Sequence, residues 1–152
     1  MNRRPLIAMT PEEQAAFLAG IKTVTLSSID GQGYPHSIAM WFSVIDGLVH
    51  MTTFRKSQKV VNIRRNPKVS LLAESGVHYS ELRGLMFRGH AELIEDVELC
   101  TRILTDIQSR YYGSADGSVR ELLRAQAAKR VAIRVHPERI ASWDHSKLGG
   151  VY

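Results

Sequence analysis

Hydrophobic and polar residues alternate along several stretches of the chain, and this two-residue period predicts β-strands. In residues 22–29, for example, Val24 and Leu26 alternate with threonine and serine. Asp-Gly pairs at residues 30–31 and 46–47 predict tight hairpin turns between such stretches. The predicted strands span residues 22–29, 34–45, 48–53, 68–74, 82–95 and 130–135, with a seventh, short strand within 139–145.

Capping residues and a 3.6-residue period predict four helices between these strands. Thr10 is the predicted N-cap of the first helix, because Glu13 lies three residues later and completes a capping box. Ser57 and Asp96 are the predicted N-caps of the second and third helices, and residues 118–130 form the fourth. The apolar face of the third helix carries Val97, Cys100, Leu104, Ile107 and Tyr111.

Closely spaced strands with helices between them favour a fold that is mainly β with flanking helices. We expect a split antiparallel β-barrel rather than a doubly wound parallel sheet, because most strands are joined by hairpins. The 152 residues suit one domain spanning residues 1–152.

Positive charge is concentrated in residues 52–72, and no acidic residue lies between Asp46 and Glu74. The chain as a whole carries a formal net charge of +5. This charge predicts an anionic partner, and a phosphorylated cofactor, nucleic acid or an anionic lipid surface would each satisfy it.

The junction between the strand 48–53 and the helix after Ser57 is the most specific part of this segment. Backbone N–H groups at a helix start attract anions, and hydroxyls and cations beside them complete a phosphate site. The candidate phosphate ligands are Thr52, Thr53, Arg55, Lys56, Ser57 and Lys59. The alternative is a solvated basic face with an ordinary helix cap.

Other classes of protein find little support. The chain has a single cysteine, Cys100, and no CxxC or HExxH motif, so we expect neither a disulfide nor a metal site. Its longest apolar stretch is too short for a membrane span. A lone cysteine is typical of a reducing cytoplasm, which is the expected location. Single-stranded nucleic acid would require aromatic residues among the cations, and residues 52–72 hold only Phe54.

The chain resembles the split β-barrel flavin and deazaflavin oxidoreductases, a family that includes pyridoxamine-phosphate oxidase and F-420-dependent reductases. The resemblance covers roughly residues 10–145, and its motifs read "LSSIDGQGYPHSIAMWF", "LVHMTTFRKSQKVVNIRRNPKVSLL", "FRGHAELIED" and "KRVAIRVHPERIASWDH". The spacing from the two threonines through Lys59 and Asn62 to Asn66-Pro67 is its most specific part.

The resemblance implies a role for each candidate. Thr52, Thr53, Ser57 and Lys59 would hold the cofactor phosphate, with Arg55 and Lys56 beside it. Backbone groups near Met40 and Trp41 would reach the ring of the cofactor. The family implies a homodimer with the cofactor between the subunits, so Trp143 and Lys147 would approach from the partner chain; for Trp143 a buried anchor is an equal alternative.

Departures from the oxidase branch point to coenzyme F-420 rather than FMN. Phe42 stands where those oxidases carry a substrate-binding lysine, Ser37 where they carry a flavin-contacting arginine, and Gly84 where they carry a glutamine. Their C-terminal Arg-x-His signature is absent. The implied activity is hydride transfer to a conjugated small-molecule acceptor, with FMN binding or a non-catalytic carrier as alternatives. His36, His78, Tyr79 or water would supply the proton, and the sequence does not choose among them.

Overall fold

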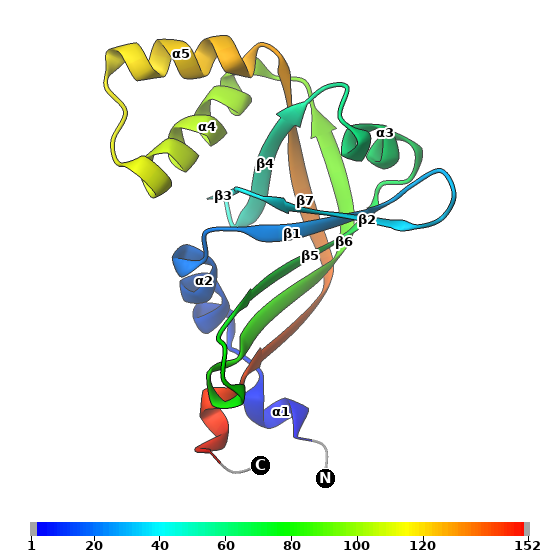
Figure 1. Ribbon diagram of the computed structural model, residues 1–152, viewed down its shortest axis with the longest axis vertical. Coiled ribbons are helices and arrows are strands. Elements are labelled where there is room, and N and C mark those ends of the chain that lie inside the picture. Colours follow the sequence, from blue (N-terminus) through cyan, green and yellow to red (C-terminus); the bar gives the residue numbers. More distant parts are fainter. Residues whose placement is uncertain (1–2, 151–152) are drawn as a thin grey trace.

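The computed structural model describes residues 3–150, and Figure 1 shows a long, curled antiparallel sheet with helices at its ends and along its sides. Seven strands lie in the order β2-β1-β5-β6-β7-β4-β3 in the described part of the chain. Every pairing between neighbours is antiparallel. The predicted split β-barrel with flanking helices is therefore confirmed. The strands are β1 (Val24–Ile29), β2 (Pro35–Met40), β3 (Ser43–Ile45), β4 (Leu48–Phe54), β5 (Lys68–Ser75), β6 (Arg83–Ile94) and β7 (Arg130–Asp144).

The single strand predicted over residues 34–45 is wrong. The chain breaks at Trp41 and Phe42, so that β2 and β3 form the two opposite edges of the sheet. Alternation alone could not show the break, because both halves carry apolar residues at every second position. At the break, Phe42 turns into the core and is fully buried, while Trp41 stays 44% exposed. The crossing from one edge to the other brings Met40 and Trp41 next to the helices α4 (Val97–Tyr112) and α5 (Gly117–Ala127).

Five α-helices and two short 3₁₀ helices surround the sheet in the described residues (Figure 1). The predicted capping box at Thr10 is present, with Glu13 N–H donating to Thr10 Oγ1 and Thr10 N–H donating to Glu13. Asp96 caps its helix as predicted. The helices are α1 (Arg4–Ile7), α2 (Pro11–Gly20), α3 (Gln58–Arg65), α4 (Val97–Tyr112), α5 (Gly117–Ala127), η1 (Tyr79–Glu81) and η2 (His145–Leu148).

Strand β7 is longer than predicted: the expected strand ends before Pro137, whereas β7 continues through Pro137 to Asp144. The ladder with β6 shifts register at Gly89, which pairs with Pro137, and Glu138 is left in the bulge. A Cβ on Gly89 would lie 2.0 Å from the carbonyl oxygen of His136, so only glycine allows this close approach. The bulge bends the strand, and one strand replaces the two that the sequence predicts.

Two apolar clusters hold these elements together. The larger one fills the concave side of the sheet and includes Phe42, Met51 and Ile133. The smaller one packs α4 and α5 against the other side of β7 near its start, with Cys100 and Ala132 in the contact. Helices α4 and α5 therefore cover one end of that face, and residues of α1 lie near its other end.

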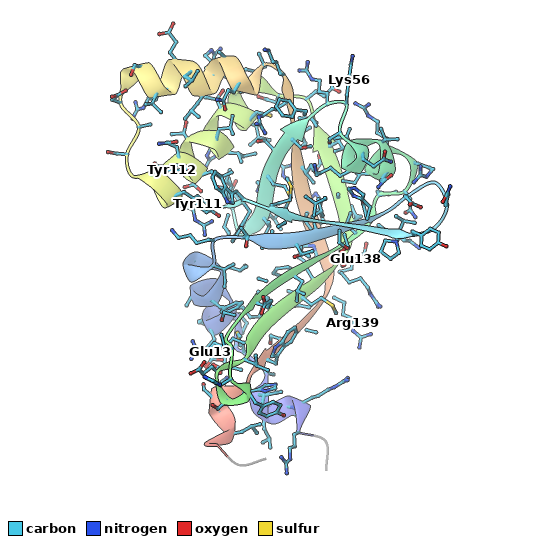
Figure 2. All side chains as sticks on the ribbon, in the orientation of Figure 1. Glu13, Lys56, Tyr111, Tyr112, Glu138 and Arg139 are labelled. Carbon is cyan, nitrogen blue, oxygen red and sulfur yellow. The ribbon has the colours of Figure 1, made fainter. Side chains whose placement is uncertain are left out.

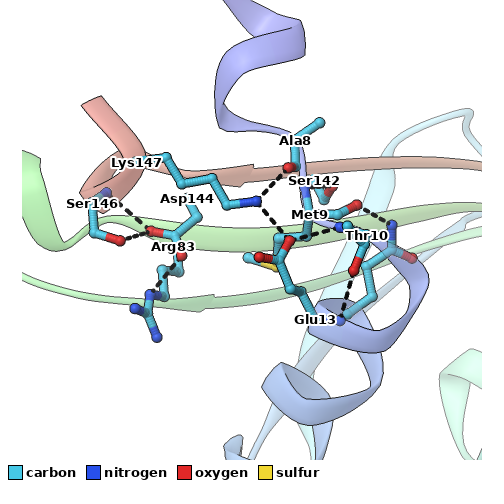
Figure 3. Close-up of polar contacts among 10 residues, drawn as sticks. Ala8, Met9, Thr10, Glu13, Arg83, Ser142, Asp144, Ser146 and Lys147 are labelled. Carbon is cyan, nitrogen blue, oxygen red and sulfur yellow. Dashed lines mark hydrogen bonds and ion pairs between the residues drawn. The ribbon is translucent and has the colours of Figure 1, made fainter. Parts of the chain in front are cut away.

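The two ends of the described chain are joined by side-chain contacts (Figure 3). Lys147 Nζ donates to the carbonyl oxygen of Ala8 at 2.8 Å and to a carboxylate oxygen of Glu13 at 2.6 Å. The N–H of Met9 donates to Ser142 Oγ at 2.9 Å. These contacts occupy the Lys147 ammonium group within one chain, and its approach to a cofactor in another subunit stays a prediction.

Removal of the Lys147 ammonium by Lys147→Met is expected to lower the thermal midpoint in a pH-dependent way. Lys147 and the N–H of Thr10 hold the pKa of Glu13 below its usual range. A depressed carboxyl pKa stabilises the fold above the unfolded value and loses this effect as pH falls through the folded value. The gap between wild type and variant should therefore shrink from pH 7 to pH 3, as thermal melts at each pH would measure. A gap that widens toward pH 3 would contradict this.

Candidate functional site

Lys59, Thr53 and Ser57 form a hydrogen-bonded chain where β4 meets α3. Lys59 Nζ donates to Thr53 Oγ1 at 3.1 Å, and Thr53 Oγ1 donates to Ser57 Oγ at 3.2 Å. Ser57 is the N-cap residue of α3 by position, but its hydroxyl does not cap the helix. The predicted side-chain cap is therefore wrong, because the hydroxyl is bonded to Thr53 instead. Three of the predicted phosphate ligands do lie together.

Arg130, which the sequence interpretation did not assign to the site, is the second cation there. It begins β7 opposite Phe54, the last residue of β4. Its guanidinium lies 4.5 Å from the centre of the Phe54 ring, and Nη1 donates to Thr52 Oγ1 at 3.4 Å. The Nε atom is buried and has no hydrogen-bond partner in residues 3–150.

The two cations repel each other and are partly removed from water. Burial lowers the pKa of the Lys59 ammonium, and the neighbouring Arg130 guanidinium lowers it further. Burial also lowers the pKa of Arg130. No carboxylate forms an ion pair with either residue in the described chain. Two half-buried cations without a counter-charge are unfavourable unless an anion binds between them.

A pocket of about 450 Å³ adjoins this cationic pair. Met40 and Trp41 line it from the chain break after β2, and Thr52 and Arg130 line it from the sheet. Its other wall comes from α4 and α5 and is mostly apolar, with Leu104, Ile107, Gln108, Tyr112, Val119, Leu122, Leu123 and Gln126. The pocket thus combines an apolar slot with a cationic end, as a flat ring carrying a charged tail requires.

Trp41 is held in place by two tyrosines at the end of α4. The rings of Trp41 and Tyr111 stack with centroids 4.5 Å apart, and Tyr112 meets Trp41 edge-on at 5.9 Å. Figure 2 shows Tyr111 and Tyr112 next to each other at the end of α4. This contact fixes one rim of the pocket.

Other candidates do not converge on this place. Lys56 points away from the body of the molecule (Figure 2), and Arg55 is exposed on the same turn. Trp143 lies near the far end of β7, about 40 Å from Arg130 along the strand at the usual rise per residue. His78 and Tyr79 lie at η1, beyond the end of β5. His36 lies on β2 and is half-buried.

Most of the chain, including the cationic junction and the pocket, matches one protein family. Residues 10–144 match the family model described as pyridoxamine 5'-phosphate oxidase. The chain belongs to this family. The family membership confirms the resemblance drawn from the sequence motifs, and it covers both the cationic junction and the pocket.

Several solved structures resemble this member of the pyridoxamine 5'-phosphate oxidase family. The conserved hypothetical protein Rv2991 of Mycobacterium tuberculosis is 40% identical with a TM-score of 0.94, over 100% of this chain and 95% of that chain. An F420 reductase is 26% identical with a TM-score of 0.66, over 83% of this chain and 94% of its own. The haem storage protein HutZ of Vibrio cholerae, 20% identical with a TM-score of 0.68, covers 96% of its own length and 89% of this chain and shows the fold alone. No match was found among curated proteins.

No helix in the described range is long and apolar enough to cross a membrane. Within residues 3–150 no group of three or more histidine, cysteine, aspartate or glutamate side chains is arranged to hold a metal ion.

Proposed function

We propose that the protein is an F-420-dependent oxidoreductase that transfers a hydride to a conjugated small-molecule acceptor. One observation carries this proposal: Lys59 and Arg130 are half-buried, close together and without a carboxylate partner in the described chain. A phosphate group would neutralise both cations and give Arg130 Nε the acceptor that it lacks.

The residues present fit a phosphorylated flavin-type cofactor. Lys59, Arg130 and the hydroxyls of Thr52, Thr53 and Ser57 would hold the phosphate, and the slot beside Met40 and Trp41 would take the ring. A bound deazaflavin supplies the hydride chemistry. The protein binds and orients the ring, and its apolar wall from α4 and α5 excludes water from it.

Two observations favour F-420 over FMN. The first is the 26% identity to an F420 reductase. The second is Phe42, which stands where the oxidase branch carries a substrate-binding lysine and is fully buried here. Its ring lies under the Arg110 guanidinium, 4.4 Å from centroid to Cζ, so no polar group replaces that lysine at the surface. Oxidation of a vitamin B6 phosphate is therefore not proposed.

We further propose that the chain is one domain that works as a homodimer in the cytoplasm. In a single chain Trp143 and Arg130 are separated by most of β7, so Trp143 reaches a cofactor only in another subunit.

Fluorescence titration with F-420 and with FMN tests the proposal. We expect Lys59→Ala to weaken F-420 binding by about 1.5–3 kcal/mol, the usual worth of a hydrogen bond to a charged group. Lys56→Ala is the matched control, because it removes the same charge from a side chain that points away from the site. Oxidation of reduced F-420 by added quinones and enones, followed by absorbance, then separates an enzyme from a carrier. Tighter binding of FMN, or equal affinities of the two variants, would contradict the assignment.

A further inference from the structure

A second cavity lies far from the cationic pair, on the outer face of β6 and β7 near α1. Its volume is about 840 Å³. The lining includes Arg88 and Arg139 from the sheet, Trp143 and Ile140 farther along β7, and Met86. None of its lining residues is acidic.

Arg88 and Arg139 occupy directly opposite positions on β6 and β7. Like charges placed opposite each other on neighbouring strands destabilise a sheet. Both side chains are exposed, and neither has an ion-pair or hydrogen-bond partner among the described residues. Figure 2 shows Arg139 extending away from the sheet. An oxyanion that bridges the two guanidinium groups would turn this repulsion into binding energy.

Trp143 gives the same cavity an aromatic surface. Its indole lies directly over Gly84, its partner on β6, where a Cβ would approach the ring to 1.9 Å. Met86 lies on the same face of the sheet as Trp143 and is 39% exposed. An apolar, flat molecule would cover these side chains and bring an attached anion to the arginines.

The register of the sheet connects this cavity with the proposed cofactor pocket. Across the sheet from β2 to β7, the residues Ala39, Thr25, Leu72, Met86 and Ala141 form one row. Ala39 lines the cofactor pocket, whereas Met86 and Ala141 line the cavity. Four strand spacings separate the ends of the row, or about 19 Å. The two sites therefore open on the same face of the sheet.

We propose that this cavity binds an oxyanion, a carboxylate or a phosphate monoester, carried on a flat apolar body. Arg88 and Arg139 bind the anion, and Trp143 and Met86 contact the body. The inference goes beyond the proposed function: about 19 Å of sheet separates this cavity from the cofactor pocket, which is too far for hydride transfer, so the cavity is a second ligand site.

Binding of three naphthalene probes to the cofactor-free full chain tests this inference. We expect 2-naphthoate or 2-naphthyl phosphate to bind saturably in calorimetry. The neutral 2-naphthamide should bind with an affinity at least about tenfold lower. The anion that binds with the higher affinity shows whether the site prefers a carboxylate or a phosphate monoester. The double variant Arg88→Gln/Arg139→Gln should lose about tenfold or more of the anion affinity, whereas Arg120→Gln, an exposed arginine on α5, should not.

The outcomes separate this inference from the cofactor assignment. The double variant leaves Lys59 and Arg130 intact, so it should bind F-420 as the wild type does. Equal binding of anions and amide, no saturable binding, or an unchanged double variant overturns the anion site while F-420 binding stands. If the wild-type protein does not bind F-420, the proposed function is overturned instead.

Discussion

Replacement of Arg130 by glutamine is expected to weaken cofactor affinity about 10- to 100-fold, the effect of losing a hydrogen bond to a charged group. The cofactor-free protein should be as stable as the wild type or more stable. Arg130 is half-buried, lowers the pKa of Lys59 and has no carboxylate partner in residues 3–150. Removal of its charge relieves repulsion and a desolvation cost, while glutamine can still bond to Thr52.

Titration and thermal melts on the same samples measure both halves of this prediction. Arg120→Gln makes the same chemical change on the exposed surface of α5 and should alter neither quantity. A variant that unfolds more easily and binds the cofactor normally would show that Arg130 has a structural role and no part in binding.

Truncation of Phe42 to alanine is expected to lower the free energy of unfolding by about 3–5 kcal/mol, the usual range for a buried phenylalanine. Phe42 is fully buried where the chain passes from one edge of the sheet to the other. The Arg110 guanidinium covers its ring and donates to the carbonyl oxygens of Phe42, Leu18 and Ile21. The variant therefore loses packing and loosens the contact that joins α4 to α2 and the sheet.

Urea denaturation measures this loss. Val44→Ala, two residues away and 42% exposed, is the control and should cost less than about 1 kcal/mol. A loss below about 1 kcal/mol for Phe42→Ala would mean that the crossing is not held by this side chain.

Local chemistry explains what could be predicted of the fold. The capping box at Thr10 and the Asp46-Gly47 turn depend on residues within a few positions, and both are present. The break at Trp41 and Phe42 and the continuation of β7 through Pro137 depend instead on which distant strands pair. Alternation is the same on either side of the break, so the sequence alone could not place it.

The site likewise contains residues that could be predicted from nearby sequence and one that could not. Thr53, Ser57 and Lys59 are close in sequence, and their convergence followed from a strand that leads into a helix. Arg130 lies 71 residues after Lys59 and reaches the site only because β7 pairs with β4. A basic residue at the start of a strand was the one signal for it, and that signal is too common to select Arg130 from the other arginines. Lys56 points away from the body of the molecule, because a turn residue next to a site can point outward as easily as inward.

A crystal structure of the protein with F-420 would show whether Lys59 and Arg130 hold the cofactor. We expect the phosphate within hydrogen-bond distance of Lys59 Nζ and the Arg130 guanidinium, with the ring beside Met40 and Trp41. A structure with the cofactor bound at another surface, and only solvent between Lys59 and Arg130, would contradict it.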